Sequence, residues 1–200
     1  EVAVLGVRLG LATPLHRTQR THAAVALVGT TLVQLDLARG FLGAGEHAAH
    51  HHRAGAGGDG LRDRVLGEQD TVDAILNISG GARGTDTVAD AKDEDWQWMY
   101  ETNVLGTVRM IQALMPKLER VPDLSGLIIN VGSIAGWTVY EGGSGYNTAK
   151  HGVRVISRAL RLENHDVRVT EIDPGRVATD FSLVRFKGDE KRAAAVYDGQ

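Results

Sequence analysis

The sequence predicts an α/β fold in which strands and helices alternate and the strands form a parallel sheet. Three apolar runs, at residues 72–77, 127–131 and 167–172, are each followed by turn-forming residues. Stretches with helical spacing of apolar residues separate these runs. A chain of 200 residues is long enough for one such domain with a buried core.

The strand at 72–77 is closed by the turn sequence Asn77-Ile78-Ser79-Gly80. A long helix is expected next, because acidic residues at 93–95 suit the positive end of a helix dipole. The residues expected on the inner face of this helix are three or four positions apart. They are Trp96, Met99, Asn103, Thr107, Met110, Leu114 and Leu118.

The strand at 127–131 ends at Gly132-Ser133, and Tyr146 opens the next predicted helix. The inner face of that helix carries Ala149, Val153, Ile156 and Leu160. The strand at 167–172 is followed by Asp173-Pro174-Gly175. Ligands of open parallel sheets bind beyond the carboxyl ends of the strands, where Asn77, Ser133 and Gly175 fall.

Composition excludes several classes of function. The net charge is −3, so no basic excess indicates nucleic-acid binding. The absence of cysteine excludes disulfides and thiolate chemistry. No apolar run is long enough to cross a bilayer, and we expect a soluble, cytoplasmic protein without membrane contact. The histidines at 47 and 50–52 are interpreted as solvated loop, and no metal site is predicted.

Tyr146 and Lys150 lie four residues apart on one predicted helix and therefore share a face. A free tyrosine titrates near pH ~10, and a neighbouring ammonium group favours the phenolate, so the pair could act as a general acid/base. Ser133 could hydrogen-bond a substrate oxygen. Such tyrosine–lysine pairs also arise on solvated helices, and Ser133 could equally be a loop cap.

Four motifs in order resemble the short-chain dehydrogenase/reductase family. Gly132-Ser133-Ile134-Ala135-Gly136 precedes Tyr146-Asn147-Thr148-Ala149-Lys150, with the serine 13 residues before the tyrosine. The segment 101–106 contains Asn103, and 174–179 is similar to the Pro-Gly motif of the family. Asn77-Ile78-Ser79-Gly80 departs from the usual Asn-Asn-Ala-Gly but keeps its first and last residues.

The resemblance implies a Rossmann-like doubly wound parallel sheet and an NAD(P)-dependent oxidoreductase. In that family the tyrosine exchanges the proton, the lysine lowers the tyrosine pKa and binds the nicotinamide ribose, and the serine orients the substrate. The asparagine holds a water that links the lysine to solvent. These roles fall on Tyr146, Lys150, Ser133 and Asn103. The cofactor-binding residues implied for this half are Asn77, Gly80, Tyr146, Lys150, Pro174, Gly175, Val177 and Thr179.

The segment 180–189 is similar to that of NADP-dependent serine and 3-hydroxy acid dehydrogenases in this family. Arg185 or Lys187 could then pair with a substrate carboxylate, and Ser133 and Tyr146 would hold the reacting oxygen. The alternative is a solvated basic loop.

The first 70 residues match the family poorly. The candidate phosphate-binding turn consists of Gly6, Arg8, Gly10 and Leu11, after a possible first strand at 2–5. Residues 24–28 fall where a second strand is expected, and Thr30 and Thr31 follow without an acidic residue, which favours NADP over NAD.

Two accounts fit residues 1 to about 70: a divergent cofactor half, or a shifted reading frame, since all lysines lie in the second part. The chain is expected to be a single domain over 1–200, with the catalytic half at 71–200. Relatives continue past Gln200 with a last helix and an edge strand, without which one sheet edge is open. A homo-oligomer, the homotetramer of the family, is expected for the full-length chain.

The resulting hypothesis is an NADP-dependent oxidoreductase acting on a small alcohol, a 3-hydroxy acid or serine-like substrate. The alternatives are a non-catalytic dinucleotide-binding protein and an inactive partial gene product on the same fold.

Overall fold

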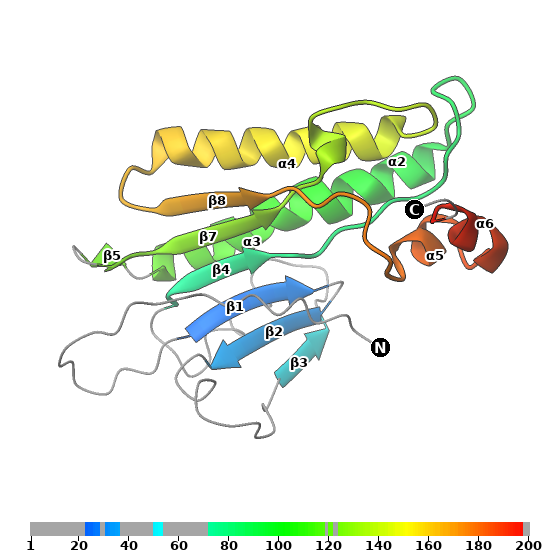
Figure 1. The fold of residues 1–200 in the computed structure, drawn as a ribbon. Coiled ribbons are helices and arrows are strands. Elements are labelled where there is room, and N and C mark those ends of the chain that lie inside the picture. Colours follow the sequence, from blue (N-terminus) through cyan, green and yellow to red (C-terminus); the bar gives the residue numbers. More distant parts are fainter. Residues whose placement is uncertain are drawn as a thin grey trace.

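The computed structural model describes residues 23–28, 31–36, 50–53, 72–118, 120–121 and 124–197. Its six-stranded sheet has the order β3-β2-β1-β4-β7-β8 (Figure 1). The strands are β1 (Ala23–Val28), β2 (Thr31–Asp36), β3 (His50–Arg53), β4 (Ala74–Asn77), β7 (Leu127–Val131) and β8 (Arg168–Ile172). A small antiparallel pair is formed by β5 (Arg120–Val121) and β6 (Leu124–Ser125).

The three predicted parallel strands are confirmed as neighbours. Asn77 of β4 lies opposite Asn130 of β7, and Val131 lies opposite Ile172 of β8. The three strands therefore end together, which brings the residues that follow them to one edge of the sheet. The expected α/β fold with a parallel sheet is present, although the complete sheet is mixed.

Residues 24–28 do not take the place predicted for them. They belong to β1, which pairs in parallel with β4, so this segment occupies the position expected for the first strand. β2 and β3 continue the sheet with antiparallel pairing, and β3 contains the histidines at 50–52 that were expected in a loop. The possible strand at 2–5 and the turn of Gly6, Arg8, Gly10 and Leu11 lie outside the described residues.

The predicted long helix is divided into segments. It consists of α2 (Asp93–Tyr100), a π-helical turn (Glu101–Leu105), α3 (Gly106–Leu114) and a 3-10 turn (Met115–Lys117). After β7 come a short 3-10 turn (Ile134–Gly136) and α4 (Ser144–Glu163), and two short helices, α5 (Phe181–Arg185) and α6 (Glu190–Ala195), follow β8. None of the helices in the described part combines the length and apolar character needed to cross a membrane.

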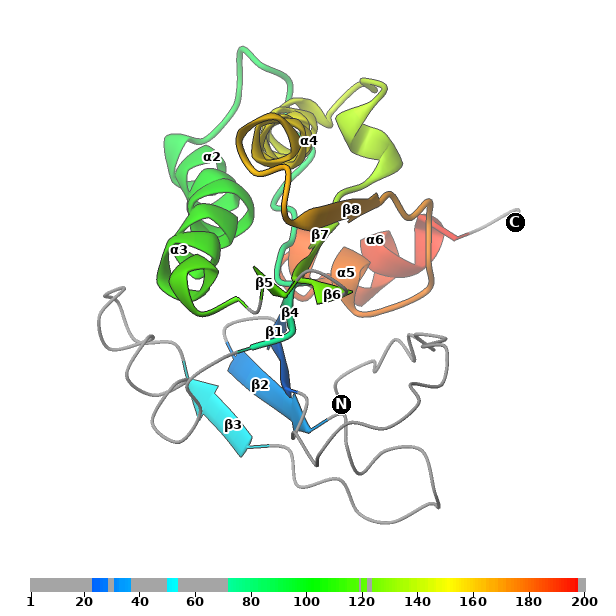
Figure 2. The ribbon, with the colours of Figure 1, turned by 90° about the vertical axis from the view of Figure 1, so that its left-hand side faces the viewer.

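α3 and α4 pack side by side on one face of the sheet (Figure 2). The main core cluster joins the buried Ile75 and Ile128 of the strands to Met110 and Leu114 of α3 and Leu160 of α4. Ala74, Leu76 and Ile129 point to the opposite face and form a smaller cluster. Because side chains alternate along a strand, one apolar run supplies both layers.

Polar groups also cross this core. Asn77 Nδ2 donates to Asn130 Oδ1 (2.8 Å), and Asn130 Nδ2 donates to Ser157 Oγ (2.9 Å). The Ser157 hydroxyl in turn donates to Val153 O (3.1 Å) within α4. This buried series connects β4, β7 and α4, although Asn77 Oδ1 itself has no hydrogen-bond partner.

Ile128→Ala is expected to lower the free energy of unfolding by about 2–5 kcal/mol, because it leaves a cavity at the centre of the main cluster. Leu162→Ala on α4 removes a comparable side chain, but Leu162 is 76% exposed whereas Ile128 is 0% exposed. The control should change stability by no more than about 0.5 kcal/mol. Urea denaturation measures both, and equal losses would contradict the assigned core.

Candidate active site

The side chains predicted to act together meet beyond the carboxyl ends of β4 and β7. Ser133 follows β7, and its hydroxyl is close enough to Tyr146, on the first turn of α4, to act on the pKa of that tyrosine. Lys150, one turn later, lies with its Nζ 5.8 Å from the centroid of the Tyr146 ring. All three residues are buried.

Ser133 also caps the short 3-10 turn that follows it. Its Oγ accepts from Ala135 N (3.2 Å), and the backbone of Ser133 is extended at φ −174°. The loop-cap interpretation is therefore confirmed for Ser133, and its role in an active site stays a prediction. The cap fixes the hydroxyl on the side where Tyr146 lies.

The ammonium group of Lys150 is held by a main-chain acceptor. Lys150 Nζ donates to Val131 O (2.9 Å), the last residue of β7. Burial, partly offset by the negative charges of Asp173 and Glu171, lowers the pKa of Lys150 to about 8. A buried ammonium group is costly because it gives up its hydration.

Asn103 lies in the π-helical turn, with its side chain directed at the turn after β4. Its Nδ2 donates to Gly81 O (2.9 Å) and to Met99 O (2.7 Å), and Thr107 Oγ1 donates to Asn103 O (2.8 Å). A Cβ placed on Gly80 would come within 2.6 Å of Asn103 Oδ1 and 3.2 Å of Lys150 Nζ. Glycine at position 80 therefore permits this close approach, and isolated π turns are frequent at functional sites.

The tyrosine pKa differs from the sequence-based expectation. Burial raises the pKa of Tyr146 to about 12, although the hydrogen bond with Ser133 and the charge of Arg185 act in the opposite direction. The side chains that act on this pKa are Ser133, Tyr140 and Arg185, so the lowering expected from Lys150 is not found in this structure. Tyr146 is further covered by Phe181 of α5, whose ring centroid lies 5.3 Å away.

The segment after β8 runs past Ser133. Ile134 N donates to Pro174 O (3.2 Å), while Gly175, Val177 and Thr179 are exposed. Asn77, by contrast, has its side chain buried against Asn130, so any contact of Asn77 with a cofactor would come from its main chain.

Arg185 and Lys187 are engaged within the protein. The Arg185 guanidinium donates to Gly84 O (3.1 Å), Tyr140 Oη (3.0 Å) and Gly142 O (3.2 Å). Lys187, in a left-handed conformation at φ 54°, forms a salt bridge of 2.9 Å with the buried Asp95. The two side chains are therefore not simply solvated. Their contacts attach α5 and the residues after it to the segments around Tyr146.

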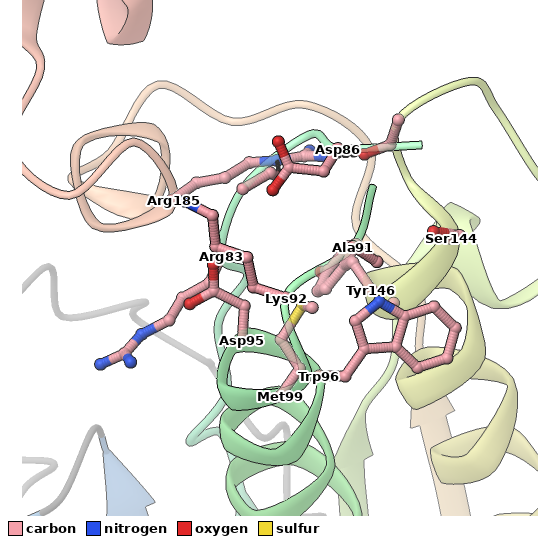
Figure 3. Close-up of a pocket in the computed structure, with 13 residues that line it drawn as sticks. Arg83, Asp86, Ala91, Lys92, Asp95, Trp96, Met99, Ser144, Tyr146 and Arg185 are labelled. Carbon is pink, nitrogen blue, oxygen red and sulfur yellow. Dashed lines mark hydrogen bonds between the residues drawn. The ribbon is translucent and has the colours of Figure 1, made fainter. Parts of the chain in front are cut away.

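A pocket opens beside Tyr146, with about 270 Å³ of free space including its opening to solvent (Figure 3). Its wall includes Arg83, Lys92, Asp95, Tyr146 and Arg185. Cationic and anionic groups therefore face the same space next to the tyrosine.

Two residues that hold the site were not selected from the sequence. Asn147 Nδ2 donates to Ala135 O (2.9 Å) and Thr138 O (2.8 Å), which braces the loop between β7 and α4. Asp173 accepts from Ser133 N (2.9 Å). The sequence did contain a hint of each role. Asn147 directly follows Tyr146, and Asp173 directly precedes Pro174-Gly175.

Comparison with known proteins agrees with this geometry. Residues 59–189 match the family model described as short chain dehydrogenase. The chain belongs to this family. The resemblance inferred from the four motifs is therefore confirmed.

The chain is 54% identical over 120 residues to an uncharacterized oxidoreductase of Mycobacterium tuberculosis, covering 59% of this chain and 47% of that protein. It is 43% identical over 129 residues to the NADP-dependent 3-hydroxy acid dehydrogenase of Escherichia coli (strain K12). This match covers 63% of this chain and 51% of that protein. It therefore spans about half the length of these short-chain dehydrogenase relatives.

Among solved structures, the closed form of serine dehydrogenase complexed with NADP+ superposes with a TM-score of 0.65 and 38% identity. The match covers 72% of this chain and 58% of that one. The two proteins therefore share a Rossmann-like fold as well as sequence similarity.

Lys150 should make the stability of the protein depend on pH. Its folded-state pKa of about 8 lies below the ordinary 10.5, so between these values the unfolded chain binds more protons. The free energy of unfolding should then rise as the pH rises through this window, by an amount on the order of 3 kcal/mol in total. The raised pKa of Tyr146 opposes this rise only above its ordinary value of 10.0.

Urea denaturation of Lys150→Met across the same pH range should show that this rise is lost. Lys191→Met, at an exposed position on α6, should retain it. A rise that persists in Lys150→Met would show that another group is responsible.

Proposed function

We propose that this chain is the catalytic part of an NADP-dependent dehydrogenase that transfers hydride between the cofactor and a small 3-hydroxy acid or serine-like alcohol. The observation that carries the proposal is the meeting of Ser133, Tyr146 and Lys150 beside Asn103 at the ends of β4 and β7. Family membership supports hydride transfer, and the names of the relatives support NADP and the substrate class. NAD is the alternative cofactor.

In this proposal Tyr146 is the proton donor to the substrate oxygen and Ser133 is its hydrogen-bonding partner. A tyrosine with a raised pKa keeps its proton at neutral pH, so it is prepared for the reduction of a carbonyl compound. Lys150 holds a positive charge next to the tyrosine ring and is available to a ribose hydroxyl. Asn103 supports the turn at Gly80 and Gly81 that faces Lys150.

The described residues fit the nicotinamide end of the cofactor. Pro174, Gly175, Val177 and Thr179 form an irregular segment beside Ser133, and a Cβ on Gly175 would meet nothing within 4 Å, so the surface there is open. When bound, NADP supplies the hydride donor or acceptor. The candidate pyrophosphate residues Gly6, Arg8, Gly10 and Leu11 lie outside the described part of the chain and belong to the proposal on sequence grounds alone.

Arg185 is the proposed partner of a substrate carboxylate. It lines the pocket next to Tyr146, and a guanidinium carries more N–H groups than its bonds to Gly84, Tyr140 and Gly142 use. The small-molecule substrate would then be held between Arg185 and the pair of Ser133 and Tyr146. A cytoplasmic location and a homotetramer belong to the proposal only through the family resemblance.

Tyr146→Phe should reduce NADPH-dependent turnover of 3-oxo acids by at least ~10²-fold, because it removes the proton donor and keeps the ring. The near-ultraviolet absorbance of the reduced cofactor follows the reaction. Tyr100→Phe, at a half-exposed position on α2, is the matched control and should keep its turnover. Full activity of Tyr146→Phe would refute the assignment.

Arg185→Lys should raise the KM for a 3-oxo acid by roughly 10- to 100-fold, since a charge-assisted pair contributes about 1.5–3 kcal/mol. Kinetics with an uncharged ketone of equal length show whether Arg185 binds the substrate carboxylate or only holds the loops in place. The ketone should show little change. An equal loss with both substrates would mean that Arg185 only joins the loops.

A further inference from the structure

Tyr197, just after α6, connects the segment that follows β8 to α5 through its hydroxyl group. Figure 1 shows α5 and α6 side by side beyond the carboxyl ends of the parallel strands. Tyr197 Oη donates to Val177 O (3.0 Å) and accepts from Ser182 Oγ (3.1 Å). A phenolic oxygen carries one proton, so the bond to Val177 O leaves Ser182 as the donor to Tyr197. The two hydrogen bonds therefore run in one direction, from α5 through Tyr197 to the main chain.

The Ser182 hydroxyl depends on this partner. Ser182 is 3% exposed, whereas Val177 is 53% exposed and its carbonyl can reach water. A buried hydroxyl without a partner loses its hydration and gains nothing in return. Arg176 Nη1 donates to Val196 O (3.3 Å), which is a second bond between the same two segments. The residues after α6 are therefore attached to the segment after β8 by side chains from both.

The segments that Tyr197 connects lie next to the tyrosine of the site. α5 begins with Phe181, whose ring centroid is 5.3 Å from that of Tyr146 and which packs against the buried cluster that contains Tyr146 and Met99. Phe181 N donates to Thr179 Oγ1 (3.3 Å). The Thr179 hydroxyl accepts this bond and keeps its own proton for a ligand oxygen. The residue that covers Tyr146 is thus bonded to the segment proposed to hold the nicotinamide.

The two ends of α5 are held by different contacts. Arg185, at its last residue, bonds the loops at Gly84 and Gly142. Tyr197 holds its first turn at Ser182. Loss of the Tyr197 hydroxyl would therefore release the turn that carries Phe181 and leave the other end of the helix attached.

We propose that Tyr197 is a positioning residue of the dehydrogenase, which holds Phe181 over Tyr146 and the segment at Val177 in one fixed arrangement. In the proposed function this segment receives the nicotinamide, so cofactor binding and the covering of Tyr146 are coupled through one hydroxyl group. The inference rests on the proposed function for its effect on NADPH. The connection between α5 and Val177 is a property of the folded chain and exists without turnover.

Three variants isolate the hydroxyl group. Tyr197→Phe keeps the ring and removes both hydrogen bonds, whereas Ser182→Ala removes only the bond from α5. The two substitutions break a shared bond, so their effects should not add, and the double variant should resemble Tyr197→Phe. Tyr100→Phe removes the same group at a half-exposed position on α2 and is the matched control.

The first measurement is hydrogen–deuterium exchange, followed by mass spectrometry, on the chain without cofactor. Exchange over residues 176–186 should be about 5-fold faster in Tyr197→Phe, the factor that corresponds to one neutral hydrogen bond. Ser182→Ala should show a smaller increase. Exchange in β4, β7 and β8 should not change, because these strands are held by their own pairing. Tyr100→Phe should match the wild type throughout.

The second measurement is the affinity for NADPH, read from the fluorescence of the bound cofactor. The Kd and the KM for NADPH should both rise about 5-fold in Tyr197→Phe, while kcat stays close to that of the wild type. A merely structural loss of folded protein would lower the apparent kcat and leave the KM unchanged. Tyr100→Phe should again match the wild type.

Unchanged exchange over 176–186 in Tyr197→Phe would overturn the inference, and so would faster exchange throughout the sheet. An NADPH affinity equal to that of the wild type would also overturn it, because the connection would then have no role in cofactor binding. If exchange changes as stated but the wild type neither binds NADPH nor reduces 3-oxo acids, the proposed function fails and the connection between α5 and Val177 stands.

Discussion

Burying the ammonium group of Lys150 beside the ends of three parallel strands is the constraint on which the site depends. Burial lowers the pKa of Lys150 to about 8, so the fold must supply compensating groups close to it. The carbonyl of Val131 is one, and the carboxyl groups of Glu171 in β8 and of Asp173 just after it are others. Close packing around the lysine also limits residue choice, since a Cβ on Gly136 would meet Lys150 O at 2.9 Å. The register of β4, β7 and β8 brings these partners together, because it makes the three strands end at one edge.

A second set of contacts connects the C-terminal segment to the rest of the site. Arg185 bonds the loops at Gly84 and Gly142, Lys187 pairs with the buried Asp95, and Arg192 donates to Thr85 Oγ1 (2.9 Å). Three cations within eight positions of sequence thus hold α5 and α6 against the segment before α2, the first turn of α2 and the loop before α4. Phe181 and Tyr146 come into contact through this arrangement. α5 and α6 therefore cover one side of the pocket beside Tyr146. They are held there mainly by hydrogen bonds and a salt bridge.

The parts that could be predicted from sequence are those with a strong local pattern. The strands at β4, β7 and β8 and the helix carrying Tyr146 and Lys150 follow from apolar periodicity and turn residues. Asn103 occupied a position in the apolar stripe of its helix, yet the π turn around it depends on bonds to Met99 and Gly81 that no local pattern encodes. The raised pKa of Tyr146 was missed because its main cause is burial, which is a property of the tertiary structure. The placement of residues 24–28 failed because strand order depends on pairing across the sheet, which spacing along the chain does not determine.

In the proposed function, proton transfer and cofactor anchoring fall on different parts of the chain. The partners described for Ser133, Tyr146, Lys150 and Asn103 lie within residues 72–197, on β7, β8, the helices α2 to α5 and the segments that follow the strands. β1 contributes to this arrangement through its parallel pairing with β4, while β2 and β3 continue the sheet away from it. The chemical groups can therefore be assembled by one part of the sheet, and the affinity for the dinucleotide phosphates can be supplied by another. In the proposed function, this division explains how Ser133, Tyr146 and Lys150 can meet in a chain whose first segment resembles the family poorly, because changes in one part need not disturb hydrogen bonds in the other.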